Sequence, residues 1–311
     1  MNAEVANRDF KYYIFDWDDN ILHMPTKIRM EHLESDGTWK PVEVSTSTFA
    51  LVRADTVNYR PPSVGGWPAA FANFADPPDV GNDQDRQNCF ILDTLAALEK
   101  VEQGARPGPS YNAMRKTLRE GRLFAIVTAR GHSPATIERA VRMFIRYALT
   151  DEEREEMMSN LRGYRQWLDG VSDDAFGTDA EELDYYLKMC RYSAVTNDGF
   201  RERMARDPIY SEKLATATTA SRPELAKEFA IRDFVEHVFH MLRRSGGLSR
   251  PVSIGFSDDD VGNVKTVSNF IRSELSKRFD GIKFVVYDTS DRTLSKGRKV
   301  CVSGQLNLPG F

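Results

Sequence analysis

Short runs of consecutive apolar residues, separated by longer stretches with helical spacing, dominate the pattern of this chain. Four of these runs stand at residues 12–15, 123–127, 251–256 and 282–287. Continuous apolar runs of this length are typical of strands buried on both faces of a parallel sheet. Two weaker patterns, at 193–196 and 299–302, predict further strands.

Between these runs, apolar residues recur every three or four positions, which predicts helices with one buried face. The predicted helices cover residues 89–103, 111–119, 134–148, 151–168, 180–191, 223–244 and 263–279. Ser133 before Pro134 is a typical helix start, and Thr150 with Glu153 forms a capping-box pattern. Strands that alternate with helices indicate an α/β protein with a Rossmann-like, mainly parallel sheet flanked by helices.

Two segments interrupt this alternation. Residues 27–54 alternate like strands, the last of them at 49–52, and predict a small β-meander. Residues 55–88 combine prolines and glycines with scattered aromatic residues. A long irregular segment of this kind is either a functional lid or an ordinary surface loop, and the sequence favours neither.

Composition narrows the class of protein. The 311 residues are 41% hydrophobic and 28% charged, which suits a packed protein of about two domains. The formal net charge of −4 gives no support to nucleic-acid binding. Cys89, Cys190 and Cys301 are scattered and odd in number, so we expect reduced thiols in a cytoplasmic protein. The sequence shows neither a signal-peptide pattern nor an apolar run long enough for a transmembrane helix.

Polar side chains follow three of the predicted strands at the point where each strand ends. These side chains are Asp16, Asp18 and Asp19 after the first, Thr128 and Arg130 after the second, and Asp258, Asp259 and Asp260 after the third. Each group alone is more often an Asx turn or a helix cap than a site. Together they predict a cluster, because the carboxyl ends of parallel strands meet at one edge of the sheet, where α/β proteins bind ligands.

Four carboxylates at one sheet edge need a compensating charge. Asp16, Asp18, Asp258 and Asp259 predict a divalent cation, and oxygen ligands of this kind favour Mg²⁺, which commonly joins carboxylates to a substrate phosphate. A threonine hydroxyl and a lysine ammonium suit the remaining phosphoryl oxygens. One carboxylate can attack phosphorus, and a second can protonate the leaving group and then activate water.

This arrangement resembles the haloacid dehalogenase superfamily of phosphohydrolases. The hydrophobic strand followed by Asp16 and Asp18 is similar to its first motif, the strand ending at Thr128 to its second, and the strand ending in Asp258 and Asp259 to its fourth. The resemblance implies that Asp16 is the nucleophile and Asp18 the acid and base. It also implies that Mg²⁺ is held by Asp16, Asp258, Asp259 and the main chain of Asp18, and that Thr128 binds the phosphoryl group.

The third motif of this superfamily is a single lysine, for which Lys227 fits best and Lys213 is the runner-up, with a solvated surface lysine as the less favoured reading. Arg130 is the best-placed arginine for an anion, next to Thr128. Arg53 and Arg60 are weaker candidates, better explained as surface charge.

Three residues near the motifs are expected to do something else. His132 is expected to face solvent, and Asp19 to be a turn residue. Asn20 departs from the family pattern, which usually has Thr or Val at that place.

The resemblance also implies a domain organisation. Residues 8–22, 110–149 and 190–305 would form the core, 23–109 an inserted cap or lid, and 150–189 a helical insertion. The predicted function is a Mg²⁺-dependent phosphomonoester hydrolase that acts on a small phosphorylated substrate. The alternatives are a catalytically silent regulatory protein that binds metal and phosphate, or a phosphatase acting on protein or nucleic-acid ends.

Overall fold

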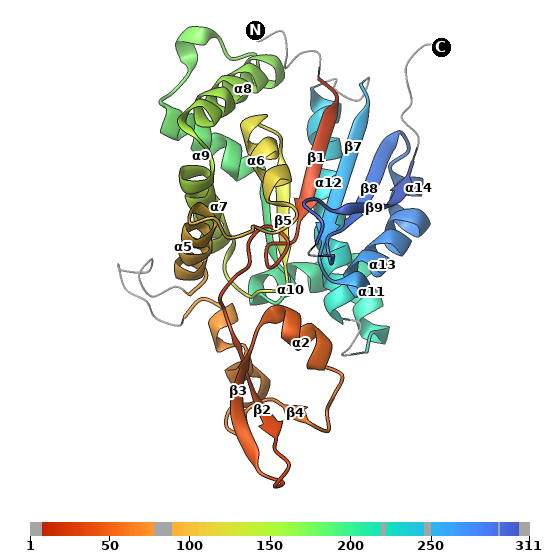
Figure 1. The fold of residues 1–311 in the computed structure, drawn as a ribbon. Helices are drawn as coiled ribbons and strands as arrows, with labels where there is room; N and C mark the ends of the chain where they lie inside the picture. Colours follow the sequence, from red (N-terminus) through yellow and green to blue (C-terminus); the bar gives the residue numbers. More distant parts are fainter. Residues whose placement is uncertain (1–7, 78–88, 219–221, 246–249, 292, 305–311) are drawn as a thin grey trace.

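A six-stranded sheet forms the centre of the protein. The computed structural model describes residues 8–77, 89–218, 222–245, 250–291 and 293–304. The strands of this sheet are β1 (Phe10–Phe15), β5 (Phe124–Thr128), β6 (Arg191–Ala194), β7 (Val252–Asp258), β8 (Ile282–Asp288) and β9 (Arg298–Ser303). Their order is β6-β5-β1-β7-β8-β9 (Figure 1).

The sheet is mostly parallel, as predicted. β1 pairs in parallel with β5 and with β7, and further parallel pairs join β5 to β6 and β7 to β8. β9 at the edge runs antiparallel to β8. The strands predicted from the four apolar runs are present, and so are the two predicted from weaker patterns, although β6 begins two residues before the predicted 193–196.

Helices pack on both sides of the strands. They are α5 (Cys89–Glu102), α6 (Tyr111–Arg119), α7 (Pro134–Ala148), α8 (Asp151–Asp169), α9 (Asp179–Met189), α10 (Asp198–Arg206), α11 (Pro208–Thr216), α12 (Arg222–Arg244), α13 (Val261–Phe270) and α14 (Ser276–Arg278), with a 3-10 turn η2 (Asp173–Ala175) and a π-helical turn η4 (Ile271–Leu275). In Figure 1, α5, α7, α8 and α9 lie at the left of the strands and α13 and α14 at the right, whereas α12 overlaps β1 and β7 in this view. Every residue of β5 is buried, as two covered faces require.

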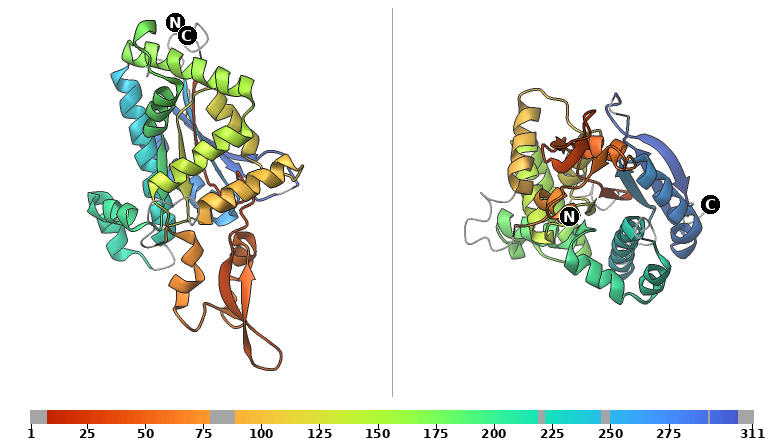
Figure 2. Two further views of the ribbon diagram at one scale, coloured as in Figure 1. Left: turned by 90° about the vertical axis from the view of Figure 1, so that its left-hand side faces the viewer. Right: turned by 90° about the horizontal axis from the view of Figure 1, so that it is seen from below.

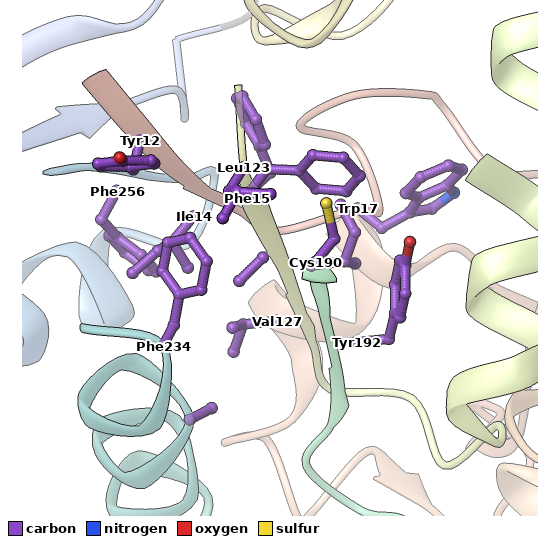
Figure 3. Packing of buried hydrophobic residues seen from close by; sticks show 14 of the residues in the cluster. Tyr12, Ile14, Phe15, Trp17, Leu123, Val127, Cys190, Tyr192, Phe234 and Phe256 are labelled. Atoms are coloured by element: carbon purple, nitrogen blue, oxygen red, sulfur yellow. The ribbon is translucent and has the colours of Figure 1, made fainter. Parts of the chain in front are cut away.

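The main hydrophobic core lies between the sheet and these helices. Figure 3 shows Ile14 of β1, Val127 of β5 and Phe256 of β7 packing together with Phe234 of α12. Helices α5, α8 and α9, which we assigned to inserted segments, also contribute buried side chains to this core. Among the described residues, no helix has the length and apolar character needed to cross a membrane.

A small subdomain projects beyond the sheet. It has a three-stranded antiparallel sheet of β2 (Ile28–Leu33), β3 (Trp39–Val44) and β4 (Tyr59–Arg60), with α2 (Thr46–Val52), α3 (Gly66–Ala70) and the 3-10 turn η1 (Ala72–Phe74). It has its own small apolar cluster. In Figure 1 and in the left view of Figure 2 this subdomain lies below the main sheet, and Figure 1 shows α2 as its part next to the core.

The prediction of a strand at 49–52 is wrong, because these residues belong to α2. The Ser45 hydroxyl accepts a hydrogen bond from the main-chain N of Thr48 at 3.1 Å and starts a helix there. Helices α10 and α11 were not predicted; each begins at a capping residue, Asn197 and Asp207. The predicted helix 263–279 is present but is interrupted by η4.

Candidate active site at the carboxyl edge of the sheet

The three polar strand ends lie side by side. β1 is flanked by β5 and β7, and all three run in the same direction. Asp16 follows β1 directly, Thr128 ends β5 and Asp258 ends β7. The main-chain N of Asp16 donates to the carbonyl oxygen of Ser257 at 3.0 Å, which places Asp16 beside Asp258.

Lys227 of α12 lies between these two carboxylates. Its Nζ is 2.6 Å from Asp258 Oδ2 and 3.5 Å from Asp16 Oδ1. The other oxygen of Asp258 accepts hydrogen bonds from Asn263 Nδ2 at 3.1 Å and from the main-chain N of Asp260 at 2.9 Å. Lys227, Asp16 and Asp258 are all buried, so the structure forms a compact buried ion cluster.

The alternative lysine lies outside this cluster. Lys213 of α11 is bonded to Glu274, with Nζ–Oε distances of 2.9 and 3.2 Å, and lies 3.6 Å from Glu228. Of the two candidates, the structure therefore places only Lys227 beside the aspartates.

The cluster carries more negative charge than Lys227 offsets. Burial raises the pKa of Asp16 well above its usual value; Lys227 opposes that shift, whereas Asp258, Asp259 and Asp18 add to it. Burial, Asp258 and Asp19 likewise raise the pKa of Asp259 to about 8. Burial alone would lower the pKa of Lys227, but Asp258 and Asp16 outweigh it and the pKa is raised. A bound cation would relieve this excess of acid.

Arg130 binds Asp18 rather than standing free. Its Nε and Nη2 donate to the two carboxylate oxygens of Asp18 at 2.9 and 2.6 Å, a bidentate pair. Thr128 Oγ1 lies 3.5 Å from Asp18 Oδ2, so this threonine also faces the acid. The structure thus brings all three together, although Arg130 is occupied by a protein carboxylate.

Aromatic rings from two elements enclose the Arg130 guanidinium. Phe74 of η1 and Phe90 of α5 lie 4.5 and 4.8 Å from it, and Nη2 also donates to Thr26 Oγ1 at 2.7 Å. Phe74 belongs to the apolar cluster of the subdomain and Phe90 to the main core. Arg130 therefore links the subdomain to the acid at the tip of β1.

The expectation that His132 faces solvent is wrong. Its ring is fully buried and stacks on Phe90, with 5.0 Å between ring centroids. Burial, together with the positive charge of Arg130, lowers the pKa of His132 to about 4. His132 is therefore neutral at physiological pH, and its burial depends on the packing of α5.

Asp19 is more than a turn residue. Its φ of 54° does place it in a left-handed turn, but its carboxylate is buried. Oδ1 lies 2.8 Å from His23 Nδ1, and Oδ2 accepts a hydrogen bond from Thr46 Oγ1 at 2.8 Å. Thr46 belongs to α2, so Asp19 attaches the subdomain to the core.

The two remaining arginines differ in position. Arg53, which follows α2, has Nη2 3.2 Å from Asp260 Oδ2 and thus lies beside the acidic loop after β7. Arg60 pairs with Glu31 at 2.7 Å and lies over Trp39, both within the subdomain. α2 is therefore attached near one end to the loop after β1 and near the other to the loop after β7.

The donor set decides how a metal could bind. Among the described residues, no three Asp, Glu, His or Cys side chains converge closely enough to form a metal site by themselves. Mg²⁺ needs fewer than three protein side chains, because it commonly binds one or two carboxylates and completes its coordination shell with water and substrate phosphate. Asp16 and Asp258 supply two adjacent carboxylates, and burial together with the neighbouring aspartates raises the pKa of Asp16, an environment that favours a cation. This donor set fits Mg²⁺.

The fold and the site define the class of this protein. It is a mixed α/β protein whose mostly parallel sheet holds a buried aspartate–lysine cluster at its carboxyl edge. No protein-family model, no curated protein and no solved structure matches the chain.

Proposed function

We propose that this protein is a Mg²⁺-dependent phosphomonoester hydrolase that works through an aspartyl-phosphate on Asp16, as its resemblance to the haloacid dehalogenase superfamily implies. The observation that carries the proposal is the position of Lys227, 2.6 Å from Asp258 and 3.5 Å from Asp16. A buried lysine between two aspartates at the carboxyl edge of a sheet suits the binding of a phosphoryl group beside a nucleophile.

Asp16, Asp258, Asp259 and the main-chain carbonyl of Asp18 would hold the metal. Bound there, Mg²⁺ would neutralise phosphoryl charge and keep the Asp16 carboxyl ionised. Lys227 and the hydroxyl of Thr128 would bind phosphoryl oxygens and orient the group for attack.

The chain's own residues carry out the two chemical steps. A carboxylate oxygen of Asp16 forms a bond to phosphorus as the bond from phosphorus to the leaving oxygen breaks, and Asp18 gives that oxygen a proton. Asp18 then takes a proton from water, whose oxygen attacks phosphorus and releases inorganic phosphate and the free Asp16 carboxylate. Asp18 can transfer these protons only when Arg130 releases one of the two Asp18 carboxylate oxygens that it binds.

The subdomain favours a small substrate. Because α2 is attached to Asp19 through Thr46 and to Asp260 through Arg53, it lies against both acidic loops beside the cluster. A small phosphorylated molecule reaches such a site more readily than a folded protein or a nucleic-acid end.

One observation favours a second candidate, a silent protein that binds metal and phosphate without turnover. The bidentate pair between Arg130 and Asp18 holds the proposed acid as an ion pair. In that case inorganic phosphate with Mg²⁺ would raise the unfolding temperature, yet no phosphate ester would be cleaved.

The test is the hydrolysis of an aryl phosphate with and without Mg²⁺, by the wild type and by Asp16→Asn. We expect Mg²⁺-dependent release of phosphate by the wild type and a loss of at least about a thousandfold in the variant. A panel of phosphorylated metabolites is then assayed in the same way. Equal rates for the two proteins would refute the assignment of the nucleophile, and stabilisation by phosphate without turnover would favour the silent protein.

A further inference from the structure

Asn20 is fully buried at the site, yet the proposed mechanism gives it no role. Its Nδ2 donates to the carbonyl oxygen of Asp16 at 2.8 Å, and it lies 3.1 Å from Ser257 Oγ and 3.3 Å from Ser257 O. Its Oδ1 accepts a hydrogen bond from Thr289 Oγ1 at 2.9 Å. The amide therefore uses both of its N–H groups and its oxygen.

These bonds continue the ladder between β1 and β7 beyond the point where the main chain can do so. The last main-chain bond between them runs from Asp16 N to Ser257 O at 3.0 Å. The chain then leaves the sheet in a tight turn, in which Ile21 N donates to Trp17 O at 3.0 Å. The Asn20 side chain donates to the Asp16 carbonyl beyond this point, so that this buried carbonyl keeps a partner, and it gives the Ser257 carbonyl a second donor.

Neighbouring segments fix Asn20 itself. The main-chain N of Ser110 donates to the carbonyl oxygen of Asn20 at 2.8 Å, and Ser110 Oγ donates to Ser257 Oγ at 3.1 Å. A Cβ atom at Gly108 would lie 2.4 Å from the same carbonyl oxygen, so only glycine allows this approach. The main-chain N of Thr289 donates to Asp258 O at 3.0 Å. Asn20 thus lies between the ends of β1 and β7, the segment at 108–110 and the segment that follows β8.

We infer that Asn20 is a positioning residue that sets the separation of Asp16 and Asp258, the two carboxylates on either side of Lys227. It bonds the main chain of Asp16 itself and of Ser257, the residue before Asp258, so any change in these bonds moves the two acids relative to each other. The inference rests on the proposed function for its catalytic consequence but not for its geometry. A threonine, which with valine is usual at this place in the family, has one donor and cannot reproduce the bonds of the amide.

Crystal structures and kinetics of Asn20→Thr test the inference, with Thr289→Val as the matched control. Thr289→Val removes the bond to Oδ1 but leaves the N–H bonds to Asp16 and Ser257. We expect the distance between Asp16 Oδ1 and Lys227 Nζ, 3.5 Å in the wild type, to exceed about 4 Å in Asn20→Thr, a limit set by the reach of an ion pair, and to stay unchanged in Thr289→Val.

Two further readouts follow. In Asn20→Thr we expect kcat to fall by about 10- to 100-fold with little change in KM, because the reacting groups are misaligned. We also expect Mg²⁺ to raise the unfolding temperature of this variant less than that of the wild type.

An unchanged Asp16–Lys227 separation, or a loss of kcat that follows the loss of stability equally in both variants, would overturn the inference. If Asn20→Thr does not fold, Asn20→Ser undergoes the same measurements. A wild type without phosphatase activity overturns the proposed function, whereas the crystal structures still decide the role of Asn20.

Discussion

At the scale of single residues, Lys227 carries the charge compensation at the carboxyl edge of the sheet. It is buried and reaches both Asp258 and Asp16. Burial raises the pKa of Asp16 well above its usual value, and the nearby ammonium opposes that shift without cancelling it. Without the ammonium, Asp258 would be a buried carboxylate with no cationic partner in the cluster.

Replacement of Lys227 by methionine therefore has a large effect. We expect a loss of unfolding free energy of about 3–5 kcal/mol, the usual cost of removing one partner from a buried ion pair, and no measurable phosphatase activity. Urea unfolding and the aryl phosphate assay measure the two. Lys213→Met is the control: its partners Glu274 and Glu228 lie outside the cluster, so we expect a change of about 0–1 kcal/mol and normal turnover. Similar losses in both variants would contradict the assignment of the lysine.

At the scale of elements, α2 connects the subdomain to the two acidic loops. Thr46 bonds Asp19, and Arg53 bonds Asp260, so the helix lies across the loops that follow β1 and β7. This position predicts that α2 limits the size of substrate that reaches Asp16.

The Arg53→Ala variant tests this role of α2. The exposed ion pair between Arg53 and Asp260 is worth about 0.2–1 kcal/mol, which corresponds to a factor of about 1.4 to 5 in a rate or equilibrium constant. We therefore expect the ratio of kcat/KM for a phosphopeptide to kcat/KM for an aryl phosphate to rise by a factor in that range. Arg60→Ala removes a pair that lies within the subdomain, and its ratio should equal that of the wild type. A ratio that responds equally to both variants would show that α2 does not limit access.

The elements also show what a sequence can predict. β1, β5, β7 and β8 were predictable because each is a continuous apolar run, and parallel pairing then brings their polar ends together. The helix at 46–52 was not, because a local cap at Ser45 outweighed the alternating pattern. Lys227 and Lys213 both lie on helices, so only the packing of α12 against the strand ends distinguishes them. The burial of His132 and Asp19 likewise depends on α5 and α2, which are remote in sequence.

At the scale of the whole molecule, the cluster makes stability depend on pH and on Mg²⁺. The pKa of Asp259 is about 8 in the folded protein, against an ordinary value of 3.8. Between these values the unfolded chain has released a proton that the folded protein still holds, so folding becomes less favourable as pH rises through this window. Above about pH 8 both states are ionised and this contribution levels off.

We therefore expect the unfolding temperature of the metal-free protein to fall between pH 5 and pH 8, by roughly 5 °C more than that of Asp259→Asn. Mg²⁺ should raise the unfolding temperature more at pH 8 than at pH 5, because the ionised carboxylates bind the cation. Thermal melts in EDTA and in excess Mg²⁺ measure both effects. Asp198→Asn, at an exposed position, should keep the wild-type slope. An identical slope in Asp259→Asn would contradict the raised pKa.

The most direct test of the account is the capture of the phosphoryl group on Asp16. The wild type is mixed with an aryl phosphate and Mg²⁺, quenched in acid within the first turnover, digested and analysed by mass spectrometry. We predict one phosphoryl group on the peptide that contains Asp16, lost on treatment with hydroxylamine and absent from Asp16→Asn. Wild-type turnover with no phosphoryl group on Asp16, or with the group on another residue, would contradict the central claim.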